Sequence, residues 1–251
     1  MLAIATHGAR VLRLSPAALP AQAGLVWRIF LQDPPQDPVV QAHLKRLVAG
    51  RDDLAVIALP GRGVTASRNA ALERAVAEGA GVLLFGDDDM VFATGTYPKL
   101  CATFAADPDL AFLCGRLVDA EGRPHKRYSP DGTPVGLLNC AKVGTPELAL
   151  RPAAFAAAGL RFESGIGAGL AVHFGEEFIL LADALRAGLR GRHSALVLGE
   201  HPPDSSGLAR TPAAELVRRQ VFRRALGPVR GRIYHALWRL REMLRRLGLP
   251  V

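Results

Sequence analysis

Short apolar runs alternate with amphipathic segments in the N-terminal part of the chain. The runs LAIAT, LVWRIFL, LAVIAL and GVLLF are separated by glycine, proline and aspartate, a pattern typical of buried strands. Between them, helical spacing predicts a helix over 38–50 and an alanine-rich helix over 66–79 that has Thr65 as its N-cap. Strands that alternate with helices indicate an α/β domain with a mainly parallel sheet, in which ligands bind at the carboxyl ends of the strands.

The segment from Glu215 onward has a different pattern, in which arginines and apolar residues interleave at helical spacing. Its ten arginines and two glutamates carry a balance of +8, which equals the net charge of the whole chain and leaves residues 1–214 neutral. We therefore expect one domain over 1–210 and a basic amphipathic helical tail over 211–251, broken at Gly227-Pro228. Such a tail can lie on an anionic membrane surface; the alternatives are docking on the domain and a homodimer contact. Nucleic-acid binding is not favoured, because no RNA-binding signature accompanies the charge.

Composition and cysteine usage narrow the class of protein. With 49% apolar residues among 251, the chain can bury a substantial core. No apolar run approaches the length of a membrane span, and the N-terminus lacks the features of a secretory signal. The three cysteines show no CxxC spacing, which argues against a disulfide framework and against a structural zinc site. We therefore expect a cytoplasmic protein.

Three adjacent aspartates, Asp87, Asp88 and Asp89, come directly after the apolar run LLFG. Like charges this close together repel one another unless a positive group lies between them. Carboxylates at the end of a strand can hold a divalent metal ion, Mn²⁺ or Mg²⁺, that binds the phosphates of a substrate. The alternative is a solvated acidic turn in which an aspartate caps a helix.

The wider sequence resembles the family 2 glycosyltransferases of the GT-A fold, over about residues 1–210. The matching motifs occur in the order of that family and comprise Thr6 with Arg10 shortly after, Ala66-Ser67-Arg68-Asn69-Ala70-Ala71-Leu72, Asp87-Asp88-Asp89, the loop GIGAG, Phe174-Gly175-Glu176-Glu177, Arg186-Ala187-Gly188, His201-Pro202 and Ser205-Ser206-Gly207. The resemblance implies a Rossmann-like mixed sheet flanked by helices. It also implies transfer of a sugar from a nucleotide-diphosphate sugar to a glycan or lipid-linked hydroxyl acceptor, in cell-surface glycan or glycolipid synthesis.

The resemblance also assigns residues to the donor site. Asp87 and Asp89 would hold the metal, with Asp89 as the more direct ligand. His201 would complete the metal shell or contact the diphosphate, and its alternative is an exposed loop histidine. Arg68 suits a diphosphate or a carboxylate of the metal site, and its alternative is a surface ion pair. At the end of the second strand the chain has Gln32-Asp33-Pro34-Pro35 in place of the family's acidic, serine-containing turn, so we expect a different nucleobase contact. The expected donor-binding residues are Thr6, Arg10, Gln32, Asp33, Arg68, Asn69, Asp87 and Asp88.

The acidic pair Glu176 and Glu177 lies at the predicted start of the helix in FGEEFILLADALRAG. Acidic residues are favoured at a helix N-terminus by the helix dipole, which is a sufficient structural reason for their presence. The functional interpretation makes one of them the general base of an inverting transfer. We expect Glu177 to be this base, with Glu176 as the competing assignment.

Two other classes of protein fit parts of the pattern. Asp87-x-Asp89-x-Val91 after an apolar strand also matches the opening motif of haloacid-dehalogenase-type phosphatases, in which the first aspartate is a nucleophile. A non-catalytic protein that binds sugar nucleotides or nucleic acid would keep the metal site without turnover. We rank the transferase first, the binding protein second and the phosphatase third.

Overall fold

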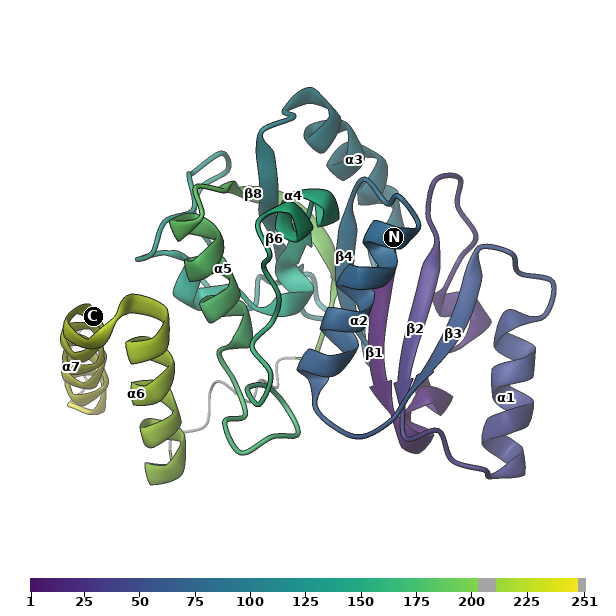
Figure 1. Cartoon of the computed structure of the whole chain (residues 1–251), viewed down its shortest axis with the longest axis horizontal. Helices are drawn as coiled ribbons and strands as arrows, with labels where there is room; N and C mark the ends of the chain where they lie inside the picture. The colour runs from purple at the N-terminus through teal and green to yellow at the C-terminus, as the bar shows by residue number, and fades with distance from the viewer. Residues whose placement is uncertain (203–210, 248–251) are drawn as a thin grey trace.

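A twisted sheet runs through the molecule and is flanked by helices (Figure 1). The computed structural model describes residues 1–202 and 211–247, and in these ranges eight strands form one sheet in the order β3-β2-β1-β4-β7-β6-β8-β5. The strands are β1 (Leu2–His7), β2 (Trp27–Gln32), β3 (Leu54–Leu59), β4 (Leu83–Asp87), β5 (Val91–Phe92), β6 (Leu110–Val118), β7 (Leu148–Leu150) and β8 (Arg190–Glu200).

The strands are mostly parallel, as the sequence predicts. β1 is parallel to both β2 and β4, β2 is parallel to β3, and β6 is parallel to β8. Among the eight strands of the described ranges, β7, between β4 and β6, and β5, at the β8 edge, pair in the antiparallel sense. The predicted α/β class with a mixed, mainly parallel sheet is therefore confirmed.

Both faces of the sheet are covered by helices. In β2, Trp27, Ile29 and Leu31 point into one core and Phe30 points into the other, because successive side chains of a strand lie on opposite faces. Helices α2, α4, α5 and α6 cover the Phe30 face, and α1 and α3 cover the opposite face. The helices are α1 (Pro38–Val48), α2 (Val64–Ala77), α3 (Tyr97–Ala106), α4 (Pro152–Ala157), α5 (Glu176–Arg186), α6 (Pro212–Leu226) and α7 (Pro228–Arg246).

The N-terminus of α2 differs from the prediction. Gly63 is the N-cap residue, whereas Thr65 lies buried within the first turn, so the expected cap at Thr65 is wrong. The amide of Val64 donates to the carbonyl of Ala168 at 3.2 Å. A backbone group of the GIGAG loop thus satisfies one of the amides at the helix start that lack a partner within the helix, and no side-chain cap is needed there.

The two C-terminal helices pack one after the other onto the domain. α6 lies against α5, where the rings of Phe178 and Phe222 are 6.1 Å apart and Arg224 Nη2 lies 2.9 Å from Asp183 Oδ2. Gly175 permits this contact, because a Cβ there would lie 2.6 Å from Val221 Cγ1. α7 packs on α6 and is the helix farthest from the sheet (Figure 1). Within the described ranges, no helix combines the length and apolarity that crossing a bilayer requires.

Candidate active site

Strand ends from both halves of the sheet bring the candidate residues to one edge. In the parallel register, His7 of β1 pairs with Gln32 of β2, and Ala5 pairs with Asp87 of β4. From the other half of the sheet, His201 follows the last residue of β8. The backbone amide of His201 donates to the carbonyl of Val118 at 3.0 Å, which fixes this loop on the end of β6.

The three predicted metal ligands converge. Ligand atoms of Asp87, Asp89 and His201 all lie within 4.8 Å of one another. His201 Nε2 is 3.7 Å from Asp87 Oδ2 and 3.4 Å from Asp89 Oδ1. The other ring nitrogen, Nδ1, lies 2.5 Å from the carbonyl oxygen of Pro202. A proton on Nδ1 can be donated to that carbonyl. Nε2 faces the two carboxylates, so it can donate to Asp87 when it is protonated and can bind a metal ion through its lone pair when it is not.

The charges at this edge stabilise one another. Burial alone would raise the pKa of Asp87, but the hydrogen bond from His201 and the nearby charges of Arg68 and Arg10 outweigh burial and lower that pKa. The hydrogen bond to Asp87 is in turn the main reason why the pKa of His201 is raised. Asp87 is therefore ionised at neutral pH, which is the state that a metal ligand needs.

This set of side chains fits a divalent cation. Asp89 Oδ1 is buried and makes no hydrogen bond within the described part of the chain. A buried acceptor that makes no hydrogen bond is costly, and a bound cation would satisfy it. Carboxylate oxygens suit Mg²⁺ and Mn²⁺, and an imidazole nitrogen suits transition metals. Asp87, Asp89 and His201 are thus the residues that could hold the ion.

The middle aspartate is oriented differently from its neighbours. Asp88 is buried and accepts a hydrogen bond from the hydroxyl of Thr6 at 2.6 Å. Arg10 donates to the same carboxylate through Nη2, at 2.6 Å, and through Nε. Arg13, which the sequence analysis did not single out, lies 3.6 Å from Asp88 and 3.5 Å from Asp89. Two arginines of one short 3₁₀ turn therefore face the aspartates, and their half-exposed guanidinium groups suit an anion.

The expected nucleobase residues lie at the same edge, on neighbouring strand ends. Gln32 is buried, and its amide donates to the carbonyl of Gly63 at 3.0 Å. Asp33 has a left-handed backbone with φ of 44°, and its carboxylate accepts from the amide of Gly61 at 2.9 Å. His7 Nε2 lies 3.3 Å from the other oxygen of Asp33. These contacts tie the ends of β1, β2 and β3 together beside the aspartates.

The helix that carries Arg68 and Asn69 reaches the other half of the site. Both polar atoms of the Asn69 amide contact the backbone of Phe162, at 2.9 and 2.8 Å. Arg68 Nη1 donates to Glu176 Oε1, and both side chains of this ion pair are almost fully buried. Arg68 thus makes a buried ion pair rather than the surface pair considered as its alternative, and the pair joins α2 to the start of α5.

The two glutamates at the start of α5 have different surroundings. Glu176 is engaged by Arg68, and Gly167 of the GIGAG loop lies so close that a Cβ there would be 3.2 Å from the Glu176 carboxyl carbon. Glu177 is half-buried, and burial together with the charge of Glu176 raises its pKa well above the usual range of a glutamate. A carboxyl group with a raised pKa is a better proton acceptor once ionised. The two glutamates thus differ: Glu176 is held in an ion pair, and Glu177 makes none among the residues described.

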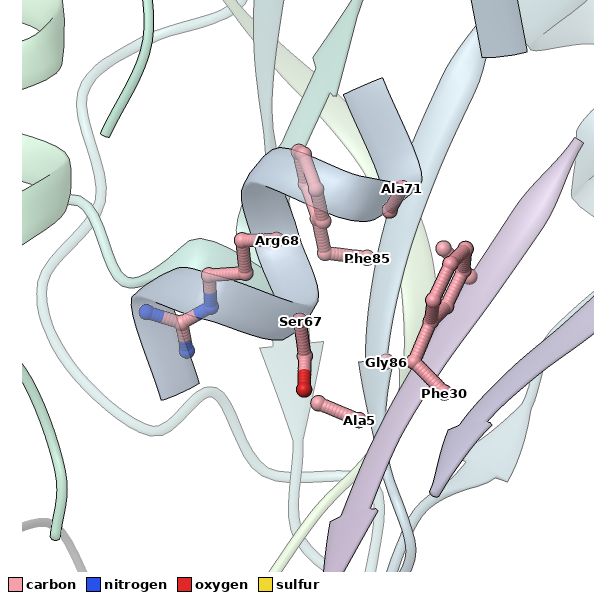
Figure 2. A pocket seen from close by; sticks show the side chains of 8 residues that line it. Ala5, Phe30, Ser67, Arg68, Ala71, Phe85 and Gly86 are labelled. Carbon is pink, nitrogen blue, oxygen red and sulfur yellow. The ribbon is translucent and has the colours of Figure 1, made fainter. Parts of the chain in front are cut away.

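A small pocket lies behind this edge, between α2 and the strands. Figure 2 shows the Ser67 hydroxyl directed toward Ala5, while the Arg68 side chain extends to the opposite side of α2 from Phe30. The Ser67 hydroxyl is buried and has no hydrogen-bond partner within the described residues. Arg68 therefore both lines this pocket and makes the ion pair with Glu176.

Another buried polar cluster lies on the β6 side and was missed by the sequence analysis. Glu147 is buried and accepts from Lys126 Nζ at 2.6 Å, from the Tyr128 hydroxyl at 2.7 Å and from the amide of Gly144 at 2.7 Å. His125, which precedes Lys126 in the chain, has its Nε2 2.7 Å from the carbonyl oxygen of His201. The cluster thus supports the loop that carries the histidine of the metal group. The motif Ser205-Ser206-Gly207 lies outside the described residues.

Comparison with solved structures supports the fold. The chain is similar to S. aureus TarS residues 1–349 (TM-score 0.59, 18% identity) and to TarS itself (TM-score 0.60, 16% identity). It is also similar to GalNAc-T7, solved with UDP, GalNAc and Mn²⁺ (TM-score 0.59, 13% identity). Each match covers 88% of this chain but only 63%, 38% and 47%, respectively, of those chains. At these identities the likeness concerns the fold, and it agrees with the GT-A architecture expected from the motifs.

Comparison at the sequence level gives the family. No curated protein sequence matches the chain significantly. The family described as "Glycosyl transferase family 2" matches residues 9–158, which include the strands β2 to β4, the Arg68 helix and the three aspartates. The match leaves the phosphatase interpretation of Asp87 without support. The chain belongs to glycosyl transferase family 2.

Proposed function

We propose that this protein is a metal-dependent, inverting glycosyltransferase that moves a sugar from a nucleotide-diphosphate sugar to a hydroxyl acceptor. The observation that carries the proposal is the convergence of Asp87, Asp89 and His201 at the carboxyl edge of the sheet. The family match and the raised pKa of Glu177 support it further. The domain over 1–210 would perform the transfer, and the segment 211–251 would form the basic tail.

The donor would lie along the edge formed by the ends of β1, β2 and β4. Asp33 and Gln32 would face the nucleoside, with Asp87 near the ribose. Arg10 and Arg68 would contribute positive charge around the diphosphate, with Thr6, Asp88 and Asn69 holding these groups in position. Mn²⁺ or Mg²⁺, held by Asp87, Asp89 and His201, would supply charge that stabilises the leaving diphosphate. The mixed oxygen and nitrogen donor set favours Mn²⁺.

The transfer step would depend on Glu177. Its carboxylate would take the proton from the acceptor hydroxyl while that oxygen attacks the anomeric carbon from the face opposite the diphosphate. The new bond joins the acceptor oxygen to the anomeric carbon, and the bond to the phosphate oxygen breaks with its electron pair leaving on the diphosphate. Configuration at the anomeric carbon is thereby inverted. Glu176 would hold Arg68 in place through the buried ion pair.

The basic tail suggests where the protein acts and which kind of acceptor it meets there. Ten arginines between 215 and 251 would attract the protein to an anionic membrane surface, where a glycan or lipid-linked acceptor for cell-surface glycan or glycolipid synthesis would be found. The three free cysteines are consistent with the cytoplasmic side of that membrane. A homodimer contact through the tail is the alternative use of the same surface.

The proposal is tested first by donor binding and then by turnover. Thermal-shift measurements with UDP-, GDP- and dTDP-sugars, with and without Mn²⁺, should identify a donor that stabilises the protein only with the metal. Release of the nucleoside diphosphate on adding an acceptor would then separate a transferase from a non-catalytic binding protein. Asp89→Ala should lose the metal-dependent shift, and Asp52→Ala, which removes an exposed carboxylate elsewhere, should retain it. A metal-dependent shift that survives in Asp89→Ala would refute the proposed site.

A further inference from the structure

The outermost helix, α7, has two apolar faces with different surroundings. Tyr234 and Trp238 point inward; the Tyr234 ring lies 5.3 Å from that of Phe222, and its hydroxyl donates to the carbonyl of Leu138 at 2.8 Å. A second set of apolar side chains is exposed, in some cases by more than half. This outward stripe consists of Val229, Ile233, Leu237, Leu240, Met243 and Leu247. Spacings of three and four residues place the set on one side of the helix along most of its length.

Arginines flank the outward stripe on both sides. At 100° per residue, Arg230 and Arg241 fall on one flank, and Arg232, Arg239 and Arg246 fall on the other. The acidic residue of this helix, Glu242, is buried on the inward side. The exposed surface of α7 thus combines a continuous apolar stripe with positive charge along both of its edges.

A groove of about 540 Å³ runs beside this stripe, between α6 and α7. Three arginines line it, Arg219 from α6 and Arg232 and Arg239 from α7, together with the exposed Leu216. Glu215 offsets part of this charge, since its carboxylate lies 3.1 Å from Arg239 Nε and 3.9 Å from His235. Among the residues described, neither Arg219 nor Arg232 makes an ion pair. The groove therefore keeps a net positive charge next to an apolar surface.

We propose that the outward stripe of α7 and the groove beside it form a docking surface for an anionic lipid bilayer. The stripe would lie at the boundary between headgroups and acyl chains, and the groove would bind the phosphate of a headgroup through Arg219 and Arg232. Helices with this distribution of apolar and basic residues bind in the membrane interface, and guanidinium groups match phosphate geometry. The inference rests on the membrane association proposed above and not on the transfer reaction.

The charge around the outward stripe favours a lipid bilayer, and not a second copy of the chain, as the partner that covers the stripe. A dimer formed across the stripe would bring the arginine-lined edges of two α7 helices together, and like charges at such distances repel. An anionic bilayer presents the opposite charge along the whole helix. The stripe and the groove would also be satisfied together, because a headgroup phosphate lies next to the apolar layer that the stripe needs.

Vesicle binding of the full-length protein tests the surface. Flotation should show binding to vesicles of phosphatidylcholine mixed with phosphatidylglycerol, weaker binding at high salt, and little binding to phosphatidylcholine alone. Replacing Arg232 and Arg239 together by glutamine should weaken binding roughly 25-fold, about fivefold for each charge. Ile233→Ser with Leu237→Ser should weaken it by roughly tenfold or more, because two apolar side chains no longer enter the interface.

Matched controls lie on α1, at the other end of the sheet (Figure 1). Lys45→Gln with Arg46→Gln removes two exposed charges there, and Val39→Ser removes an exposed apolar side chain. These variants should bind vesicles like the unaltered protein, as should Asp89→Ala. All the altered residues on α7 are exposed, so the thermal midpoints of the variants should be unchanged.

Four outcomes would overturn the proposal, and they differ in how far they reach. Equal binding to neutral and anionic vesicles would refute recognition of anionic headgroups by the arginines. No vesicle binding at all would remove membrane association as well as this surface. Binding that persists in both α7 double variants would refute only the assigned surface. A dimer in solution that dissociates in Ile233→Ser with Leu237→Ser would identify the stripe as a contact between copies. None of these results bears on the metal site, because Asp89→Ala is measured separately.

Discussion

Charge is organised differently at the aspartate edge of the sheet and along α7. At the edge, Asp87, Asp88 and Asp89 meet a histidine and two arginines within hydrogen-bonding or ion-pair distance. Along α7, the arginines are spread over an exposed helix. Converging charges at fixed positions can select a small ion and its phosphate ligand, whereas spread charge matches an extended surface. The two regions would then have separate ligands: the edge would bind the sugar-nucleotide donor, and α7 would bind the membrane surface.

Single substitutions should change stability more where charges are buried in pairs, as at the site, than along the exposed helix α7. Removing one partner of a buried pair leaves an uncompensated charge in a low-dielectric interior, which is strongly destabilising. Exposed arginines are solvated and screened, so each contributes little to stability. The predictions below sharpen or break this contrast.

The largest expected effect is on turnover. Glu177→Gln should slow the chemical step by roughly a hundred- to ten-thousand-fold while leaving donor binding intact, because the amide cannot accept the acceptor's proton. Single-turnover kinetics and donor titration with the identified sugar nucleotide would separate the two quantities. Glu121→Gln, at an exposed glutamate, is the control. Near-normal turnover in Glu177→Gln would exclude this residue as the base.

The next effect concerns the buried ion pair. Arg68→Met should lower the free energy of unfolding by about 3–5 kcal/mol, because Glu176 stays buried without its partner. Arg241→Met, on the exposed side of α7, should change it by no more than about 0.5 kcal/mol. Urea denaturation of both variants at neutral pH measures the difference. Similar losses in the two variants would contradict the contrast between buried and exposed charge.

Much of the N-terminal half could be predicted from the sequence because its elements are long, periodic and separated by glycine, proline and aspartate. The elements between Val91 and Ala157 were not predicted. Among them, β7 has only three residues and α4 only six, too few for periodicity to register. β6 is a nine-residue, mostly apolar segment that its length and flanking residues could have revealed. The sheet order itself depends on antiparallel pairing of β7 with β4, which no local pattern encodes.

The same limits apply to the candidate site. β4 ends at Asp87, and Asp88 and Asp89 lie in the turn that follows, so the alternation of a strand does not give the different orientation of Asp88. Arg13 follows Arg10 by three residues, one turn of a 3₁₀ helix, and that spacing was available from the sequence. The pairing of Arg68 with Glu176 was not, because the two residues are 108 positions apart. Long-range packing thus decides which of the two glutamates is held in an ion pair.

A third prediction ranks the aspartates. Asp89→Ala should weaken Mn²⁺ binding by about a hundredfold or more, because it removes a ligand of the metal group. Asp88→Asn should weaken it by about ten- to a hundredfold, since Asp88 acts through Thr6 and Arg10. Isothermal titration with Mn²⁺ measures both affinities. A larger loss for Asp88→Asn would show that the middle aspartate is the ligand; Arg239→Gln on α7 should have no effect.

The smallest expected effect is a pH-dependent change in stability. Burial and the charge of Glu176 raise the pKa of Glu177 in the folded protein above its unfolded value, so the folded state binds the extra proton more tightly. Stability is then fully present below the unfolded pKa and is lost as the pH rises through the raised folded pKa. Glu177→Gln removes this penalty and should melt at a higher temperature than the unaltered protein at pH 8 but not at pH 4. A shift of about 2–4 °C in the melting temperature corresponds to each kcal/mol for a chain of this size.

Scanning calorimetry from pH 4 to pH 8 measures the difference between Glu177→Gln and the unaltered protein, and Arg241→Gln on α7 should show no such trend. A midpoint difference that shrinks as the pH rises would contradict the raised pKa, and with it the buried environment that suits Glu177 to accept a proton.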